Sequence, residues 1–304
     1  MNHLRITTAQ LAQLCGVSQG TVDRALNHRQ GISPQTKEKI LRTASQYGYR
    51  EATGNFKVLP KSAGQIGIIV FNLNNEYFCK LITEIESACR SLNYTTMVMF
   101  TNYDKTAEIE YIRQMYHLGV EGIVLCAAGS GPEFEKYLAS FDIPIVAVGN
   151  DIPSVPYIGV DDYSAMKFAV EEILKEGYRK AVYFSPAILY EDAYAQKRRY
   201  EGFLAALPQG ITYSVITDIE EMAEDYSSDT VIICSTDYYA LKVYFKVKCV
   251  RIIGFDNIDI LEKYKIPITS VAYSISTIAR GAVETIAGKR QGDLFLEYQL
   301  VRRD

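Results

Sequence analysis

The side chains best suited to chemistry near the N-terminus are Gln19 and Arg24. A glutamine amide can donate to and accept from adenine in one bidentate contact, and an arginine can make two parallel hydrogen bonds to guanine. Side chains suited to phosphate oxygens lie beside them at Ser18, Thr21 and Asn27. A helix that presents Gln19, Gly20, Thr21 and Arg24 at its N-terminal end is therefore expected to read base edges in the major groove of DNA.

Three short helices are predicted to position these residues. The first follows Thr7, which has the spacing of a capping box with Gln10, and ends at Gly16. Ser18 caps the second helix, and Ser33-Pro34 begins a third that ends at Gly48. The expected apolar faces are Leu11, Leu14 and Cys15, then Val22, Ala25 and Leu26, then Ile40, Leu41 and Ala44. Because only three residues separate the first two helices, they must cross steeply, as in a helix-turn-helix.

Charge is divided unevenly along the 304 residues. Residues 1–61 contain nine Lys and Arg against three acids, a net charge of +6, so the remaining residues carry -10 of the total of -4. A basic head on an acidic body is typical of a polyanion-binding module attached to a domain that does not bind polyanions itself.

The rest of the chain is predicted to be an α/β body. Residues 51–64 lose helical periodicity and form a linker. Short apolar strands then alternate with amphipathic helices, a pattern that favours parallel sheets with right-handed crossovers. The strand candidates are 66–70, 122–127, 144–148 and 181–184, and the first helix carries Leu81, Ile82, Ile85, Ala88 and Leu92 on one face.

Several classes of protein are disfavoured by the sequence. No apolar run reaches the ~20 residues of a membrane span, and no signal peptide is evident, so the cytosol is the expected location. The six cysteines are interpreted as reduced core thiols, and the three histidines share no metal-ligand spacing. Neither a phosphate-binding loop nor a nucleophile elbow is present, and neither a cofactor nor an enzyme activity is expected.

Residues 16–27, followed by Ile32-Ser33 and Tyr47-Gly48-Tyr49, resemble the DNA-binding head of the LacI/GalR (lactose repressor) family. The resemblance places Gln19, Gly20 and Arg24 at base-reading positions. It also implies a hinge helix that inserts an apolar side chain into the minor groove, and the matching position is Val58. The usual proline and asparagine are replaced by Glu51 and Ala52, which favours a weaker or differently placed hinge.

The resemblance extends through the body to the periplasmic-binding-protein-like type I sensor domain of the same family. It implies a helix-turn-helix head at 1–50, a hinge linker at 51–64, and an effector-binding and dimerisation domain at 65–304. The body consists of two doubly wound parallel-sheet lobes, one formed by 65–159 and about 274–290, the other by about 160–273 and 291–304. Ligands of such sheets bind beyond the carboxyl ends of the strands, which predicts a site in the cleft between the lobes.

The resemblance also implies effector-binding residues. Arg199 matches the family arginine that bonds ligand hydroxyls, and Asp256 matches the effector-binding carboxylate. Tyr77 and Phe78 follow a strand end, where an aromatic ring could either stack on a ligand or pack in the core. The full expected set is Asn74, Tyr77, Phe78, Asp161, Arg199, Thr236 and Asp256.

Three departures from the family pattern bear on specificity. Asp23 stands where a small hydroxyl is usual, and its carboxylate must pair with Arg24 or turn away from phosphate. Thr236 replaces a ligand-binding asparagine, and Glu76 replaces a proline.

The favoured hypothesis is a cytoplasmic transcription regulator, most simply a repressor, that binds double-stranded operator DNA as a homodimer and responds to a sugar or sugar derivative. A nucleoside effector, and a corepressor in place of an inducer, stay open. A solute-binding protein and a sugar-acting enzyme are the alternatives outside this class.

Overall fold

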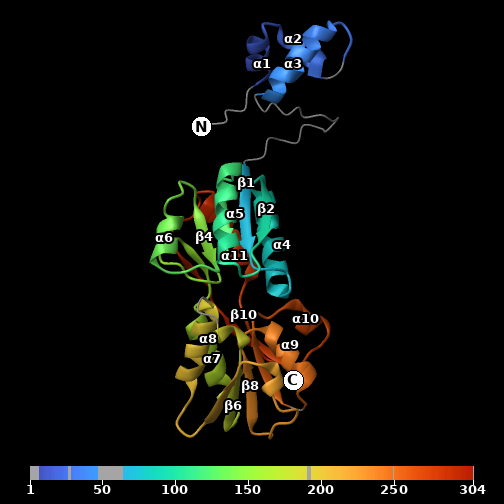
Figure 1. The fold of residues 1–304 in the computed structure, drawn as a ribbon. Helices are drawn as coiled ribbons and strands as arrows, with labels where there is room; N and C mark the ends of the chain where they lie inside the picture. The colour runs from blue at the N-terminus through green and yellow to red at the C-terminus, as the bar shows by residue number, and fades with distance from the viewer. Residues whose placement is uncertain (1–6, 27–28, 47–63, 190–192, 249, 304) are drawn as a thin grey trace. The chain divides into compact units, whose positions relative to one another are not determined.

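The computed structural model describes residues 7–26, 29–46, 64–189, 193–248 and 250–303, and the chain divides into one unit within residues 1–61 and another within 62–304 (Figure 1). Asn27, Gly48 and Val58, together with most of the predicted linker, lie outside the described residues.

The N-terminal unit consists of three helices, α1 (Thr8–Cys15), α2 (Gln19–Leu26) and α3 (Pro34–Gln46). The capping box is confirmed: the Thr7 hydroxyl accepts a hydrogen bond from Gln10 N, and Thr7 N donates to Gln10 Oε1 at 2.8 Å. Gly16 ends α1 at φ +64°, a conformation that glycine adopts without steric cost. The three helices pack around a common core of Leu11, Ala12, Cys15, Val22, Ala25, Leu26, Ile40 and Ala44.

Two residues predicted for the apolar faces of these helices do not belong to that core. Leu14 is 47% exposed and Leu41 is 37% exposed, so these two members of the predicted apolar faces do not contribute to the buried core. Three short helices enclose little volume, and their few inward positions are filled by other side chains.

The first lobe of the C-terminal unit is a six-stranded parallel sheet in the order β11-β5-β4-β3-β1-β2. Alternate residues of β1 face opposite sides, because Ile66 and Ile68 pack with α4 and α11 whereas Ile69 packs with α5 and α6. The elements are β1 (Gly64–Val70), α4 (Glu76–Ser91), β2 (Tyr94–Phe100), α5 (Lys105–Leu118), β3 (Gly122–Leu125), α6 (Pro132–Leu138), β4 (Ile145–Val148), β5 (Tyr157–Gly159), α11 (Ile275–Ile286) and β11 (Leu294–Phe295).

The second lobe repeats this architecture in the order β12-β10-β9-β8-β6-β7, with only β12 antiparallel to its neighbour. Helices α7 and α8 cover one face of the sheet, and α9 and α10 cover the other (Figure 1). The elements are α7 (Asp162–Leu174), β6 (Lys180–Phe184), the 3-10 helix η1 (Pro186–Leu189), α8 (Tyr194–Ala206), β7 (Thr212–Ile216), the 3-10 helix η2 (Ile219–Glu221), β8 (Thr230–Cys234), α9 (Asp237–Lys246), β9 (Arg251–Phe255), α10 (Asp259–Lys263), β10 (Ile268–Ala272) and β12 (Gln299–Val301).

The chain passes between the lobes three times, after β5, after β10 and after β11. The last passage lies later than the predicted residue 291, because Leu294 and Phe295 still pair with β5 of the first lobe. The four strand candidates in the body correspond to β1, β3, β4 and β6.

Five of the six cysteines lie within the described residues, and all five are free thiols. Cys15, Cys89, Cys126 and Cys234 are buried, whereas Cys79 is half-buried. None of the helices in the described ranges is long and apolar enough to cross a membrane.

Candidate functional site

Helix α2 divides into a buried face and an exposed face. Val22, Ala25 and Leu26 are buried, whereas Gln19, Gly20 and Arg24 are exposed and Thr21 is half-buried. A β-carbon at Gly20 would meet nothing closer than Ser18 Oγ at 3.9 Å, so packing does not require glycine there. The predicted base-reading positions therefore share one surface that is available to a ligand.

The predicted phosphate contacts Ser18 and Thr21 also organise the start of α2. Ser18 Oγ accepts a hydrogen bond from Thr21 N at 3.2 Å and lies 2.9 Å from Thr21 Oγ1. Thr7 performs the same capping at α1. These hydroxyl groups thus fix both helix N-termini, where unpaired backbone N–H groups favour an anion such as phosphate.

Asp23 pairs with Arg29 rather than with Arg24. Asp23 Oδ2 accepts a hydrogen bond from Arg29 Nη1 at 3.2 Å, and both side chains are exposed. The pair partly neutralises the carboxylate, while Arg24 is exposed beside the other predicted base-reading positions of α2.

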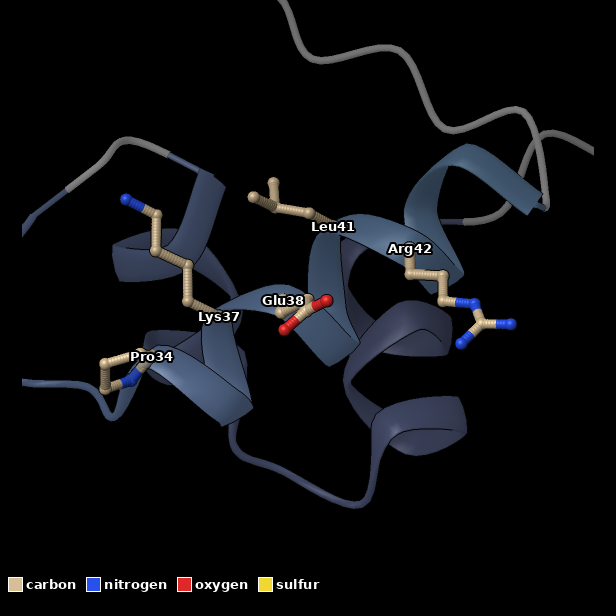
Figure 2. A pocket seen from close by; sticks show the side chains of 5 residues that line it. All are labelled: Pro34, Lys37, Glu38, Leu41 and Arg42. Atoms are coloured by element: carbon tan, nitrogen blue, oxygen red, sulfur yellow. The ribbon is translucent and has the colours of Figure 1, made fainter.

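A surface depression on α3 does not qualify as a ligand site. Figure 2 shows that its five lining side chains, Pro34, Lys37, Glu38, Leu41 and Arg42, all project from this one helix. Among the described residues no second element contributes to this lining, so a small molecule there would stay largely in contact with water.

The C-terminal unit contains a cavity of about 670 Å³ whose lining comes from both lobes. Its walls are formed largely by residues that directly follow β1, β3, β4, β8, β9 and β10, where the strand topology predicts a ligand. Six of the seven predicted effector residues line it, namely Asn74, Tyr77, Phe78, Arg199, Thr236 and Asp256.

Arg199 lies between two carboxylates at the buried end of this cavity. Its Nε donates to Asp162 Oδ1 at 2.7 Å, and its Nη2 lies 3.5 Å from Asp256 Oδ1. Nη1 donates to the Ser235 carbonyl oxygen at 2.7 Å, and the guanidinium lies 3.7 Å from the centre of the Phe255 ring. The neighbouring Arg198 pairs with Glu201 instead, so Arg199 is the arginine of this basic run that reaches the cavity.

Burial dominates the pKa shifts of the two acids in this triad. It raises the pKa of Asp162 from 3.8 to about 6, although Arg199 opposes the shift. It also raises the pKa of Asp256, again against the influence of Arg199. For Arg199 itself burial favours the neutral form, but the two carboxylates outweigh it and keep the guanidinium charged. A positive charge is thus balanced by two acidic groups that are costly to ionise.

The backbone around Asp256 adopts a conformation that side chains rarely occupy. Asp256 has φ +104° and Asn257 has φ +48°. The buried Asp237 holds this turn in place, because its carboxylate accepts hydrogen bonds from Ile258 N and from Ser270 Oγ. Tyr273 Oη donates to Asp256 Oδ1 at 2.7 Å. Strained residues persist only where their surroundings hold them, and they cluster at ligand sites.

Two further polar side chains belong to the lining of the cavity. Thr236 caps α9 by accepting from Tyr239 N. Gln196 lies three residues before Arg199 on α8, and its buried Oε1 accepts no hydrogen bond from any described residue. An unsatisfied buried acceptor costs about 1–3 kcal/mol, which a ligand donor would recover.

Asp161 is the one predicted effector residue that does not line the cavity. Its carboxylate caps α7 by accepting from Ser164 N at 3.1 Å and from Ser164 Oγ, whereas Asp162 reaches Arg199. The spacing from Asp161 to Ser164 is a local capping signal that could have distinguished the two acids. Glu76 lies in the first turn of α4 and is also absent from the lining. Sequence reasoning missed the roles of Asp162, Gln196, Asp237 and Tyr273.

The geometry defines a class of protein: a helix-turn-helix unit joined to a two-lobed ligand-binding unit, as in ligand-responsive DNA-binding regulators. Residues 9–51 match the family model "Bacterial regulatory proteins, lacI family". Residues 63–245 match "Periplasmic binding proteins and sugar binding domain of LacI family". The chain belongs to the LacI family of bacterial transcription regulators, with a DNA-binding head and a sugar-binding domain.

Relatives over nearly the full length are regulators. The chain is 24% identical to catabolite control protein A of Priestia megaterium over 91% of both chains. It is also 24% identical to the sucrose operon repressor of Lactococcus lactis subsp. lactis over 97% of both.

Solved structures share the fold. A LacI-type regulator from Alkaliphilus metalliredigens, complexed with D-xylulofuranose, gives a TM-score of 0.67 at 25% identity over 80% of this chain and 98% of its own. The lac repressor dimer bound to operator gives 0.66 at 16% identity over 98% of both chains, a likeness of fold alone.

Proposed function

We propose that this chain is a repressor that acts in the cytoplasm as a homodimer on operator DNA, and that a neutral sugar or sugar derivative in the body cavity sets its operator affinity. The observation that carries the effector half is the charge balance of the buried end, where Arg199 lies between Asp162 and Asp256. A guanidinium already matched by two carboxylates offers donors and acceptors to hydroxyl groups without selecting an anion.

Each cavity residue then has a role in holding the sugar. Asp162 and Asp256 accept hydrogen bonds from ligand hydroxyl groups, and Arg199 donates to them. Gln196 Oε1 accepts from a further hydroxyl, and Tyr77 and Phe78 contact the apolar face of a ring. We place Asn74 and Thr236 among the remaining contacts.

The DNA half of the proposal assigns base readout to Gln19, Gly20 and Arg24, with Thr7, Ser18 and Thr21 at phosphates. Two heads are required because helix-turn-helix proteins bind half-sites about one helical turn apart. The lac repressor is a dimer on its operator, which supports the same assembly here. Asn27 and Val58 stay proposed DNA contacts from the family resemblance.

We further propose that the cavity binds its sugar without converting it, in line with relatives that are named as regulators. Incubation of purified protein with candidate sugars, followed by chromatography, tests this point. A stoichiometric excess of product over protein would contradict it.

The effector is tested by thermal unfolding of the full chain against pentoses, hexoses, their phosphates, disaccharides and nucleosides. A ligand at ~100 times its dissociation constant adds about 2.7 kcal/mol of stability. Neutral sugars should raise the midpoint more than sugar phosphates or nucleosides do. Stabilisation by phosphorylated sugars or nucleosides alone would overturn the assignment.

Gln196→Ala tests whether the sugar binds in the body cavity. We expect it to weaken sugar binding about two- to tenfold, the value of one hydrogen bond. Gln114→Ala is the matched control, because Gln114 bonds to Glu110 on the surface of α5 and does not line the cavity. Operator binding with and without the bound sugar then distinguishes an inducer from a corepressor.

Arg24→Ala tests the reading helix. It should remove most of the selectivity between operator and random DNA, because a bidentate arginine contact supplies ~1–3 kcal/mol of discrimination. Arg42→Ala on α3 removes the same charge from the head and should lower affinity for both DNAs equally (Figure 2). Equal selectivity in the two variants would show that α2 is not the reading helix.

A further inference from the structure

The cavity of the body has two ends that differ in exposure. The triad of Asp162, Arg199 and Asp256 is buried at one end, each residue 4–6% exposed. The other end is formed by exposed residues of the first lobe, Asn74, Asn102, Tyr103 and Lys105, together with Lys242 of the second lobe. A ligand that fills the cavity therefore extends from the charged triad toward solvent.

Tyr103 is the most distinctive residue of the exposed end. Its ring stacks on Phe71, with 4.4 Å between ring centres and 14° between planes, yet the residue is 60% exposed. Phe78 also packs against Phe71, with 5.5 Å between the ring centres and the two rings nearly perpendicular. One lobe thus presents a fixed aromatic surface inside the cavity.

The backbone that carries this ring is held in an unfavourable conformation. Asn102 has φ +50° and Tyr103 has φ +66°, a region that a bulky side chain such as tyrosine rarely occupies. Hydrogen bonds from Asn102 N to the Phe71 carbonyl oxygen, at 2.7 Å, and from Asp104 N to that of Thr101 fix the turn. Exposed aromatic area and backbone strain at one cavity position together indicate a contact made with a ligand.

The cavity is larger than a single sugar ring. A hexose has ~12 non-hydrogen atoms, and even at the ~30 Å³ that each molecule of liquid water occupies it fills roughly 360 Å³. The cavity measures about 670 Å³. One sugar ring at the buried triad leaves room for a second ring at the exposed end.

We infer that the effector is a disaccharide or longer oligosaccharide, with one ring at the Asp162–Arg199–Asp256 triad and a second stacked on Tyr103. The inference rests on the proposed function, since it assumes that the cavity binds a neutral sugar. The apolar C–H face of a sugar ring suits an aromatic ring, and the polar groups of Asn74, Asn102 and Lys105 suit its hydroxyl groups.

The test is calorimetric titration of the full chain with glucose, galactose, fructose and xylose, and with cellobiose, maltose, trehalose, lactose, sucrose and xylobiose. A disaccharide should bind at least tenfold more tightly than either of its component monosaccharides. Tyr103→Asn removes the ring but keeps a residue that tolerates positive φ, and it should weaken the disaccharide about five- to tenfold while changing monosaccharide binding less than twofold.

Two further variants make the result specific to the ring. Tyr103→Phe keeps the ring and should bind the disaccharide as tightly as the original protein. Tyr213 is 49% exposed and lies outside the cavity, so Tyr213→Ala should leave disaccharide affinity unchanged. A monosaccharide that binds as tightly as every disaccharide, or a disaccharide affinity insensitive to Tyr103→Asn, overturns the inference and leaves the proposed function intact. Absence of binding by any sugar overturns both.

Discussion

The head and the body hold their polar side chains in opposite ways. On α2, Gln19 and Arg24 project into solvent, and the core beneath them is made by other residues. In the cavity, Arg199 is held by the carboxylates of Asp162 and Asp256 and by the Ser235 carbonyl oxygen. The side chains of Arg199, Asp162 and Asp256 are all buried. At the proposed base-reading positions of the head, the exposed side chains and the buried core are therefore different residues, whereas in the proposed effector site the same side chains face the cavity and hold one another in place.

This difference has a consequence for substitution. A change at the proposed base-reading positions of α2 should alter DNA binding and preserve the fold, because exposed side chains contribute little to stability. A change in the triad leaves a buried charge without its partner, which costs far more than an exposed ion pair contributes. Four substitutions test how complete the separation is.

Arg199→Ala should have the largest effect. It leaves Asp162 and Asp256 buried without a counter-charge and removes the stacking on Phe255, so we expect about 3–5 kcal/mol of destabilisation in urea unfolding. Arg198→Ala, which breaks the exposed pair with Glu201, should cost under ~1 kcal/mol. Similar losses of stability in the two variants would show that the buried triad contributes no more to folding than the exposed pair does.

The pH dependence of stability should come next. Since burial raises the pKa of Asp162 to about 6, the folded body retains a proton that the unfolded chain has released between about pH 4 and 6. The contribution of this group is therefore complete below pH 4 and is lost as the pH rises through 6, by up to about 3 kcal/mol. Asp162→Asn should make this part of the urea-unfolding profile less steep, with the remaining slope coming from Asp256 and Asp237, whose pKa values burial also raises. An unchanged profile would assign the whole titration to those other groups.

Gly254→Ala should cost about 1–3 kcal/mol, the usual penalty for an overfilled core. A β-carbon there would lie 1.9 Å from Asp237 Oδ1, so the carboxylate that holds the Asp256 turn must move. Sugar affinity should fall together with the thermal midpoint. Loss of stability at full sugar affinity would show that the turn does not depend on Asp237.

Gly20→Ala should have the smallest effect on folding and the opposite sign. Alanine in an open helical position stabilises by about 0.5–1 kcal/mol relative to glycine, and Gly20 has open space around its α-carbon. Operator affinity should nevertheless fall, since the added methyl group lies at a proposed base-reading position. A gel-shift assay that shows unchanged operator affinity would remove Gly20 from the DNA contacts.

Much of the architecture could be predicted from local signals. Local signals marked the helix boundaries in the head: the Thr7 and Gln10 capping box, Gly16, and the pair Ser33-Pro34. Apolar runs marked the strands β1, β3, β4 and β6. The predicted position of the last crossing between the lobes, at residue 291, was too early, because Leu294 and Phe295 still belong to the first lobe. The two-residue strand β11 carries too little pattern to separate it from a loop, and its pairing with β5 joins segments more than 130 residues apart.

The candidate site was predicted in outline, and its errors have one physical cause. Asp161 and Asp162 are adjacent acids, and only the packing of α7 against α8 decides that the second reaches Arg199. In the same way Leu14 follows the periodicity of α1, but the small core of the head has no room for it.

The sequence by itself determined the helix caps, the strand periodicity, the basic head and the residues presented by α2, because these depend on neighbours within a few positions along the chain. Only the tertiary structure decided which polar side chains meet in the cavity. Asp162, Gln196 and Tyr273 line the cavity and come from α7, α8 and the residue after β10, whereas Asp237 of α9 holds the nearby Asp256 turn. The burial of these side chains, and the pKa values of the two acids and of Tyr273, depend on groups brought together by folding.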